Sequence, residues 1–235
     1  MEKNKTGKYL KYAIGEIVLV VIGILIALQI NNWNDQRLMR INEKSYLNEI
    51  SINLIQDSLK LNEVLNFNTS KLKVIENMQG IFSTSYTNEE RYEIFSANAG
   101  GYLNYGFFEP IKTAYSNMIS AQSIDLIRDS NLKQMLSEYY EYDYKGGIQE
   151  RLISINRRVV DKYWPKFITK ESVMKDLNID VDLISYKELA IHKETEFLAY
   201  LGGSKQLVKE QNNMLKEIKR QNLNLILRIN NYVDK

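Results

Sequence analysis

The chain has 235 residues, of which 31 are Lys or Arg, 29 are Asp or Glu and none is Cys. This length is typical of one domain with a full hydrophobic core. The missing cysteines exclude disulfides, thiolate nucleophiles and Cys-ligated zinc. The formal net charge of +2 belongs entirely to residues 1–31, so the rest of the chain is electrically balanced. Such a chain lacks the basic excess that neutralises nucleic-acid phosphates, and we predict no nucleic-acid partner.

The first predicted element is an apolar helix over residues 12–30, which overlaps the stretch GEIVLVVIGILIALQINNWN of residues 15–34. At about 1.5 Å per residue it spans roughly 28 Å, close to the hydrocarbon thickness of about 30 Å. The run is apolar on all sides, and no small-x-small cleavage motif follows it. It therefore predicts an uncleaved single membrane span rather than a core helix or a secretion signal. Glu16, near its start, is compatible with insertion because the surrounding Ile, Leu and Val residues outweigh its cost.

The charges at the two ends of the run predict its orientation. The four lysines before the run are Lys3, Lys5, Lys8 and Lys11, whereas acidic residues dilute the basic ones after it. The positive-inside rule then predicts a cytoplasmic tail at residues 1–11, a transmembrane helix at 12–30 and a periplasmic helical-bundle domain at 31–235. Trp33 is the expected anchor at the outer interface. Since so short a tail has no room for an output module, any signal would pass through a partner.

The stretch YAIGEIVLVVIGILIALQINNWN, with LNEI and AYSNMISAQSIDLIRDSNLKQMLSEYY further along, is the most distinctive wording in the chain. It resembles a family of uncharacterised bacterial single-pass inner-membrane proteins whose hallmark is an N-terminal segment of nearly this sequence. The resemblance is closest over residues 12–34 and looser over roughly 105–140. It implies a bacterial inner-membrane anchor with a helical periplasmic region. The family carries no assigned activity, so the resemblance implies no catalytic residues.

After the anchor, apolar residues at spacings of three and four predict a helix over residues 38–78 that continues the anchor and ends by Gly80. The main apolar stripe consists of Leu47, Ile50, Leu54, Leu61, Leu65, Leu72 and Ile75. A second stripe consists of Ile41, Ile52, Ile55 and Leu59. The second stripe widens the apolar face and favours a helical bundle over a free two-stranded coiled coil.

Cap and breaker residues divide the middle of the chain. Thr87 and Glu90 form a capping-box pattern for a helix that ends by Gly100 and Gly101. Pro110 is expected to open the next helix. Residues 129–131 are expected to cap a further helix that runs from Leu132 toward Trp164 and ends at Pro165. Within that range, Gly146 and Gly147 are expected to form a kink or a turn.

The C-terminal third contains a second capping-box pattern, Ser185 with Glu188, for a helix ended by Gly202 and Gly203. Ser204 is expected to cap the last helix. Its apolar residues Val208, Leu215, Ile218, Leu225, Ile229 and Tyr232 have the spacing of a coiled-coil seam, interrupted by the polar residues Gln211 and Asn222. The fold class is therefore all-α: a transmembrane helix that continues into a long helix of an extracytoplasmic helical bundle.

Catalytic signals are weak. Glu188, His192 and Glu196 would share one helix face and in principle ligate a metal, but they fall mostly outside the apolar stripe, which favours a solvated face. The sequence has no phosphate loop, nucleophile elbow or zinc spacing. We predict no enzyme, and assign no catalytic residue, cofactor or metal. The tyrosines of EYYEYDYKGG favour core packing over a patch for a cationic ligand.

Two regions are candidates for partner binding. In the anchor, Gly15, Glu16, Gly23 and Ala27 form a candidate intramembrane interface, because small residues four apart permit close helix contact. Glu16 either caps backbone and meets nearby lysines or pairs with another membrane protein. In the loop-rich region, the candidate partner patch is Phe107, Phe108, Tyr115, Asp125 and Asp129. The favoured alternative is that its aromatic residues fasten a short helix to the long ones.

These observations favour a membrane-anchored periplasmic helical protein that acts as an interaction or accessory subunit of a membrane assembly. Its expected partners are the lipid bilayer and another membrane protein or a second copy of the chain. The alternative is a periplasmic ligand-sensing module with a pocket lined by Tyr and Phe, which signals through a partner. A hydrolytic or metal-dependent enzyme is the least favoured hypothesis.

Overall fold

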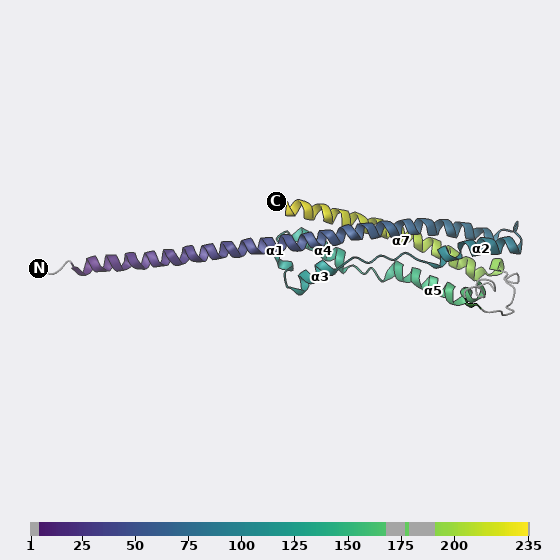
Figure 1. The fold of residues 1–235 in the computed structure, drawn as a ribbon, viewed down its shortest axis with the longest axis horizontal. Helices are drawn as coiled ribbons and strands as arrows, with labels where there is room; N and C mark the ends of the chain where they lie inside the picture. Colours follow the sequence, from purple (N-terminus) through teal and green to yellow (C-terminus); the bar gives the residue numbers. More distant parts are fainter. Residues whose placement is uncertain (1–4, 168–176, 179–190, 235) are drawn as a thin grey trace.

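The structure, a computed structural model, describes residues 5–167, 177–178 and 191–234 (Figure 1). These residues form helices joined by loops, and no β-strand occurs among them. The predicted all-α class is therefore confirmed.

The longest element is α1, Lys5–Gln79, a single helix of 75 residues whose N-terminal part extends away from the rest of the structure (Figure 1). Neither Gly nor Pro occurs between Gly23 and Gly80, so no residue in that stretch breaks the helix. As predicted, α1 ends directly before Gly80, where the chain turns through the 3-10 helix η1, Gly80–Phe82.

The other helices pack along the C-terminal half of α1 (Figure 1). In chain order they are α2 (Asn88–Leu103), α3 (Thr113–Ser120), the 3-10 helix η2 (Ile124–Leu126), α4 (Ser130–Glu141), α5 (Gly147–Phe167), the 3-10 helix η4 (Ile191–Lys193) and α7 (Thr195–Val233). Helix α7 lies against α1 and runs in the opposite direction, so its C-terminal end returns toward the apolar run. Helices α3 and α4 lie nearer the anchor, and α2 and α5 lie at the far end.

The contact between α1 and α7 follows one residue pattern on both helices. The residues buried on α7 include Phe197, Leu201, Ser204, Val208, Gln211, Leu215, Ile218, Asn222, Leu225 and Ile229, which alternate spacings of three and four. The predicted polar interruptions Gln211 and Asn222 are both buried there. The Asn222 side-chain amide donates to the Leu54 carbonyl on α1 at 2.9 Å. The spacing predicted from the sequence is thus the one that buries this face.

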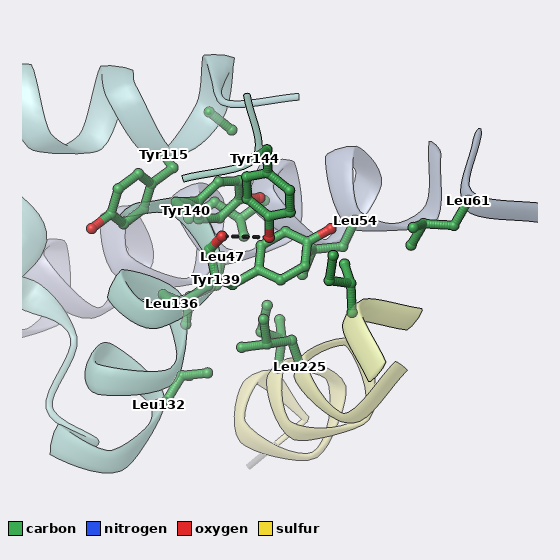
Figure 2. Close-up of a cluster of buried hydrophobic side chains, with 14 of the residues drawn as sticks. Leu47, Leu54, Leu61, Tyr115, Leu132, Leu136, Tyr139, Tyr140, Tyr144 and Leu225 are labelled. Atoms are coloured by element: carbon green, nitrogen blue, oxygen red, sulfur yellow. Dashed lines mark hydrogen bonds between the residues drawn. The ribbon is translucent and has the colours of Figure 1, made fainter. Parts of the chain in front are cut away.

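The main hydrophobic cluster joins α1, α3, α4 and α7, and Figure 2 shows its tyrosines and leucines from these helices. The Tyr144 hydroxyl donates to the Tyr139 carbonyl at 2.7 Å (Figure 2), and the rings of Tyr115 and Tyr140 stack with centroids 4.6 Å apart. The tyrosines of residues 138–147 therefore pack in the core, as favoured, except for Tyr142, which is exposed.

Two predicted caps have the expected geometry. The Glu90 backbone N–H donates to the Thr87 hydroxyl at 3.2 Å, while the Thr87 N–H donates to the Glu90 carboxylate at 2.7 Å, so the capping box opens α2. The Asp129 carboxylate accepts from the N–H groups of Asn131 and Leu132 and caps α4. Each cap satisfies backbone donors that a helix start leaves unpaired.

The glycine pairs predicted to end helices lie inside them instead. Helix α2 passes through Gly101, and α7 passes through Gly203. A Cβ at Gly101 would lie 2.9 Å from Val74, and one at Gly203 would lie 3.1 Å from Ile155. Their role is therefore close helix packing, which offsets a helix cost of about 1 kcal/mol per glycine. It follows that Ser204 is not a cap but a buried residue of α7.

The kink or turn predicted at Gly146 and Gly147 is confirmed as a turn, because α4 ends at Glu141 and α5 begins at Gly147, which has a φ of +61°. The boundaries near the two prolines, in contrast, differ from the prediction. Helix α5 continues through Pro165 to Phe167. Helix α3 begins at Thr113 rather than at Pro110. Two side chains of α1 accept from backbone N–H groups at this point: Asp57 accepts from Ile111, and Asn53 accepts from Ala114. The second capping box, at Ser185 and Glu188, lies outside the described residues.

Candidate interaction surface

The N-terminal part of α1 is long and apolar enough to cross a membrane, with a mean hydropathy of 2.6 over its most apolar 18-residue window. None of that window is buried inside the structure. Gly15 and Gly23 leave open space, because an added Cβ at either would meet nothing within 4 Å. Glu16 and Ala27 are exposed as well. The predicted intramembrane interface thus remains accessible to a partner, and it stays a prediction.

The second apolar stripe of α1 lies outside the bundle, contrary to the expectation that it widens the buried face. Ile41 is 51 % exposed, Ile52 56 %, Ile55 49 % and Leu59 62 %. The physical reason is rotation by about 100° per residue, since Ile55 is one residue from the buried Leu54, Ile52 is two from the buried Ile50, and Leu59 is two from the buried Leu61. We call these four residues the outer face of α1.

The outer face continues the side of α1 that carries the small residues of the anchor. Gly23, Ile41 and Leu59 follow one another at intervals of 18 residues, which is five turns of an ideal α-helix. Glu16 and Ile52 are 36 residues apart, which is ten turns. Because α1 is one continuous helix over this range, a partner that lies along the anchor on this side meets the outer face next.

A polar cluster fastens α1 to the end of α7 just beyond the apolar run. Glu43 is fully buried and accepts from the Arg40 guanidinium at 2.6 Å, the Tyr232 hydroxyl at 2.6 Å and the Arg128 backbone N–H at 3.1 Å. Burial alone would raise the pKa of Glu43, but these hydrogen bonds together hold it below the ordinary value. The Arg40 guanidinium also lies over the Tyr232 ring, 4.5 Å from its centroid. We call Glu43 and these three donors the Glu43 cluster.

The same part of α1 caps the end of α7. Arg40 donates to the Tyr232 carbonyl at 3.2 Å, and the Lys44 ammonium donates to the Val233 carbonyl. Carbonyls at a helix C-terminus lack intrahelical partners, so cations placed there stabilise the helix end. The outer face therefore belongs to a helix whose orientation against the bundle is held at the end of the bundle nearer the apolar run.

A lysine is buried in the interior at the far end of the bundle. Lys71 is 1 % exposed, and its ammonium donates to the Asn104 carbonyl and, at 3.3 Å, to the Asn156 side chain. The Tyr102 ring lies 5.6 Å away. Among the described residues no carboxylate forms an ion pair with it. Burial accordingly lowers the pKa of Lys71 to about 7.

The candidate partner patch has structural roles. Phe108 and Tyr115 are buried and Phe107 is half-buried, as expected if the aromatic residues fasten α3 to the long helices. Asp125 forms an ion pair with Lys133 at 2.9 Å. Asp129, besides capping α4, pairs with Arg228 of α7 at 2.5 Å. The patch therefore presents little free apolar surface to a partner.

The predicted helix face of Glu188, His192 and Glu196 is not one continuous helix in the part that the structure describes. His192 lies in η4 and Glu196 in α7, while Glu188 lies outside the described residues. The Glu196 carboxylate accepts from the Lys162 ammonium and from the Tyr200 hydroxyl, at 2.7 Å. Over residues 5–167, 177–178 and 191–234, no cluster of three metal-ligating side chains occurs.

Sequence reasoning missed the Glu43 cluster and the burial of Lys71. The spacing of Arg40 and Glu43 on α1 is a local signal for an ion pair. Nothing in the sequence indicates that Tyr232, 189 residues further on, completes it. Lys71 follows the buried Asn68 by three residues and precedes the buried Ile75 by four, so it continues the spacing of the buried face of α1. This spacing is the sequence signal that could have predicted its burial.

Comparison with known families yields one match. The model of DUF6090, described as a family of unknown function, matches residues 16–189, which include Glu16 and most of α1. Comparison with curated proteins and with solved structures yields no match. The matched range is well over half of the 235 residues. The chain therefore belongs to DUF6090, a family of unknown function.

Proposed function

We propose that this protein is a membrane-anchored interaction subunit that assembles with a second copy of itself through the outer face of α1. The observation that carries the proposal is the exposed stripe of Ile41, Ile52, Ile55 and Leu59 on the helix that also forms the anchor. Four large apolar side chains in line on one helix are typical of a helix-binding surface. The proposal assigns no catalytic activity and no cofactor.

The occupant of the outer face is inferred from membrane geometry and residue spacing. Two copies inserted in one bilayer with the same orientation hold their α1 helices parallel. Alternating spacings of four and three relate Ile41, Ser45, Asn48, Ile52, Ile55 and Leu59, which is the repeat of a coiled-coil seam, and the shared membrane orientation makes the paired helices parallel. In such a pair Asn48 occupies a d position of the repeat and faces the Asn48 of the second copy, so that the two side-chain amides can hydrogen-bond to each other.

The proposed location is the bacterial inner membrane, crossed once, with the N-terminus in the cytoplasm and the bundle in the periplasm. The support is the excess of lysine before the apolar run and the exposed Trp33 directly after it. With this orientation the outer face projects into the periplasm above the membrane surface. The pair of copies then presents two bundles to the other members of a membrane assembly.

Disulfide cross-linking tests the proposal cleanly because the chain has no cysteine of its own. Leu59→Cys in the full chain, in membranes, is expected to yield a covalent dimer under mild oxidation, since facing seam residues of paired helices lie within disulfide reach. Leu227→Cys on α7 is the matched control, because Leu227 is 63 % exposed and Leu59 62 %. The control should remain monomeric. Equal cross-linking of both variants, or of neither, contradicts the proposal.

A second substitution tests whether the apolar side chains of the outer face stabilise the dimer. Ile52→Lys placed in the Leu59→Cys background is expected to lower the yield of cross-linked dimer at least about ten-fold, because each copy loses apolar burial worth about 1 kcal/mol and gains a facing charge. The same lysine at Leu223, an exposed residue of α7, should leave the yield unchanged. A dimer that tolerates Ile52→Lys would place the contact between copies elsewhere.

A further inference from the structure

We infer that the membrane-facing end of the bundle binds the phosphate group of an anionic phospholipid through a basic pocket beside α1. The pocket has a volume of about 460 Å³ and lies directly beyond the apolar run. Its lining is Trp33, Gln36, Arg37, Arg40, Ile41, Lys44 and Arg128. The inference does not depend on self-association, because the pocket is built within one copy of the chain.

The pocket carries positive charge that the protein itself leaves largely unpaired. Four of its lining residues are cationic and none is acidic. Glu43 pairs with Arg40. Within the described part of the chain, no ion pair with a carboxylate occurs for Arg37, Lys44 or Arg128. The hydrogen bonds of Arg37 and Lys44 go to neutral oxygens, the Asn34 side chain at 3.4 Å and the Val233 carbonyl. An anion is therefore the complementary ligand.

The height of the pocket above the apolar run matches the level of lipid phosphates. Arg37 follows Ile30 by seven residues, or about 10 Å of helix, and the headgroup layer beyond the hydrocarbon edge is about 5–8 Å thick. Helix side chains lean toward the N-terminus, so the long Arg37 side chain points back toward the membrane. Trp33, 65 % exposed, lies at the interface itself. Clustered cations within a Debye length of a membrane surface attract anionic lipid headgroups, and the attraction falls off beyond that distance.

The walls of the pocket are held in place by the Glu43 cluster. The Arg128 backbone N–H donates to Glu43, which positions the segment after η2 beside α1. Arg128 is exposed and lines the pocket from that segment, whereas the other three cations of the lining belong to α1. Two guanidinium groups on different segments can each offer paired N–H donors to phosphate oxygens, the geometry that arginine favours. The site is thus preformed for a phosphate held between α1 and the loop.

A phosphate group reaches this pocket either on a lipid or as a free ion, and the test separates the two sources. The full chain is reconstituted in bilayer nanodiscs that contain equal amounts of phosphatidylglycerol and phosphatidylcholine, then extracted in mild detergent. Native mass spectrometry counts the lipids that remain bound. In a parallel arm, the detergent-solubilised chain is titrated with inorganic phosphate alone.

The wild-type chain is expected to retain phosphatidylglycerol over phosphatidylcholine, and Arg37→Gln with Arg128→Gln should reduce the retained phosphatidylglycerol about ten-fold. Arg157→Gln with Lys216→Gln is the matched control, since it removes two exposed cations away from the pocket. Circular dichroism verifies that both variants keep their helical content. An equal loss of phosphatidylglycerol in the control variant would show that retention depends on the overall charge of the protein and not on the pocket, which would overturn the inference. Binding of inorganic phosphate without retention of phosphatidylglycerol would overturn the lipid source.

Discussion

Replacing Lys71 with methionine is expected to raise the free energy of unfolding by about 2 kcal/mol at pH 7. Lys71 is 1 % exposed and has no ion-pair partner among the described residues. An ammonium group buried without a counter-charge costs several kcal/mol, and only part of this is recovered from the hydrogen bonds to Asn104 and Asn156. Methionine has a similar length and no charge, so the substitution keeps the packing and removes the cost.

The effect of Lys71→Met should depend on pH in a defined direction. Burial lowers the pKa of Lys71 from 10.5 to about 7 in the folded protein. Between pH 7 and about 10.5 the unfolded chain therefore binds more protons than the folded one, and the contribution of Lys71 to stability rises with pH. The variant lacks this rise, so its advantage over the wild type should shrink as the pH increases from 7 to 9.5.

Denaturant unfolding of the full chain in detergent at pH 7 and pH 9.5, followed by circular dichroism, measures both effects. Lys73→Met is the control, because Lys73 lies two residues away on α1 and is exposed. It should change the free energy of unfolding by less than about 0.5 kcal/mol at either pH. A Lys71→Met protein that is less stable than the wild type at pH 7 would show that the hydrogen bonds of Lys71 outweigh its desolvation.

Replacing Glu43 with alanine is expected to lower the free energy of unfolding by about 3 kcal/mol. Glu43 is fully buried and accepts hydrogen bonds from Arg40, Tyr232 and Arg128, which come from α1, α7 and the segment before α4. Its loss leaves three donors without their acceptor, and removal of one partner of a buried ion pair costs about 3–5 kcal/mol. The lower end applies because Arg40 retains 27 % side-chain exposure.

The pH dependence at Glu43 has the opposite form to that at Lys71. Desolvation alone would raise the pKa of Glu43, and the hydrogen bonds from Tyr232, Arg40 and Arg128 bring it below 4.5. A carboxyl whose pKa is lowered by folding contributes stability above its unfolded pKa, and this contribution is lost as the pH falls through the folded value. The difference between wild type and Glu43→Ala should therefore be largest near pH 7 and decrease below pH 4.5.

Glu49→Ala provides the comparison for Glu43→Ala, because Glu49 is an exposed carboxylate on the same helix. It should stay within about 0.5 kcal/mol of the wild type at pH 7 in the same denaturant experiment. If Glu43→Ala behaves like Glu49→Ala, the Glu43 cluster does not hold the end of the bundle nearer the apolar run.

Local patterns were enough to predict several elements correctly. The absence of Gly and Pro after Gly23 predicted the continuous helix α1, and the capping box of Thr87 and Glu90 predicted the start of α2. Both depend on backbone groups within a few residues of each other. Glycine predicted helix ends correctly before Gly80 but wrongly at Gly101 and Gly203, which lie inside helices and allow close packing against Val74 and Ile155.

The sequence by itself determined the all-α class, the apolar run and the register of the buried face of α7, since helix periodicity and the length of an apolar stretch are properties of the chain alone. Only the tertiary structure decided which of two apolar stripes on α1 is buried. It also placed Lys71 in the interior and brought Tyr232 to Glu43. These features depend on how α1, α7 and the loops between them rotate and dock, and spacing along one helix does not specify what packs against it.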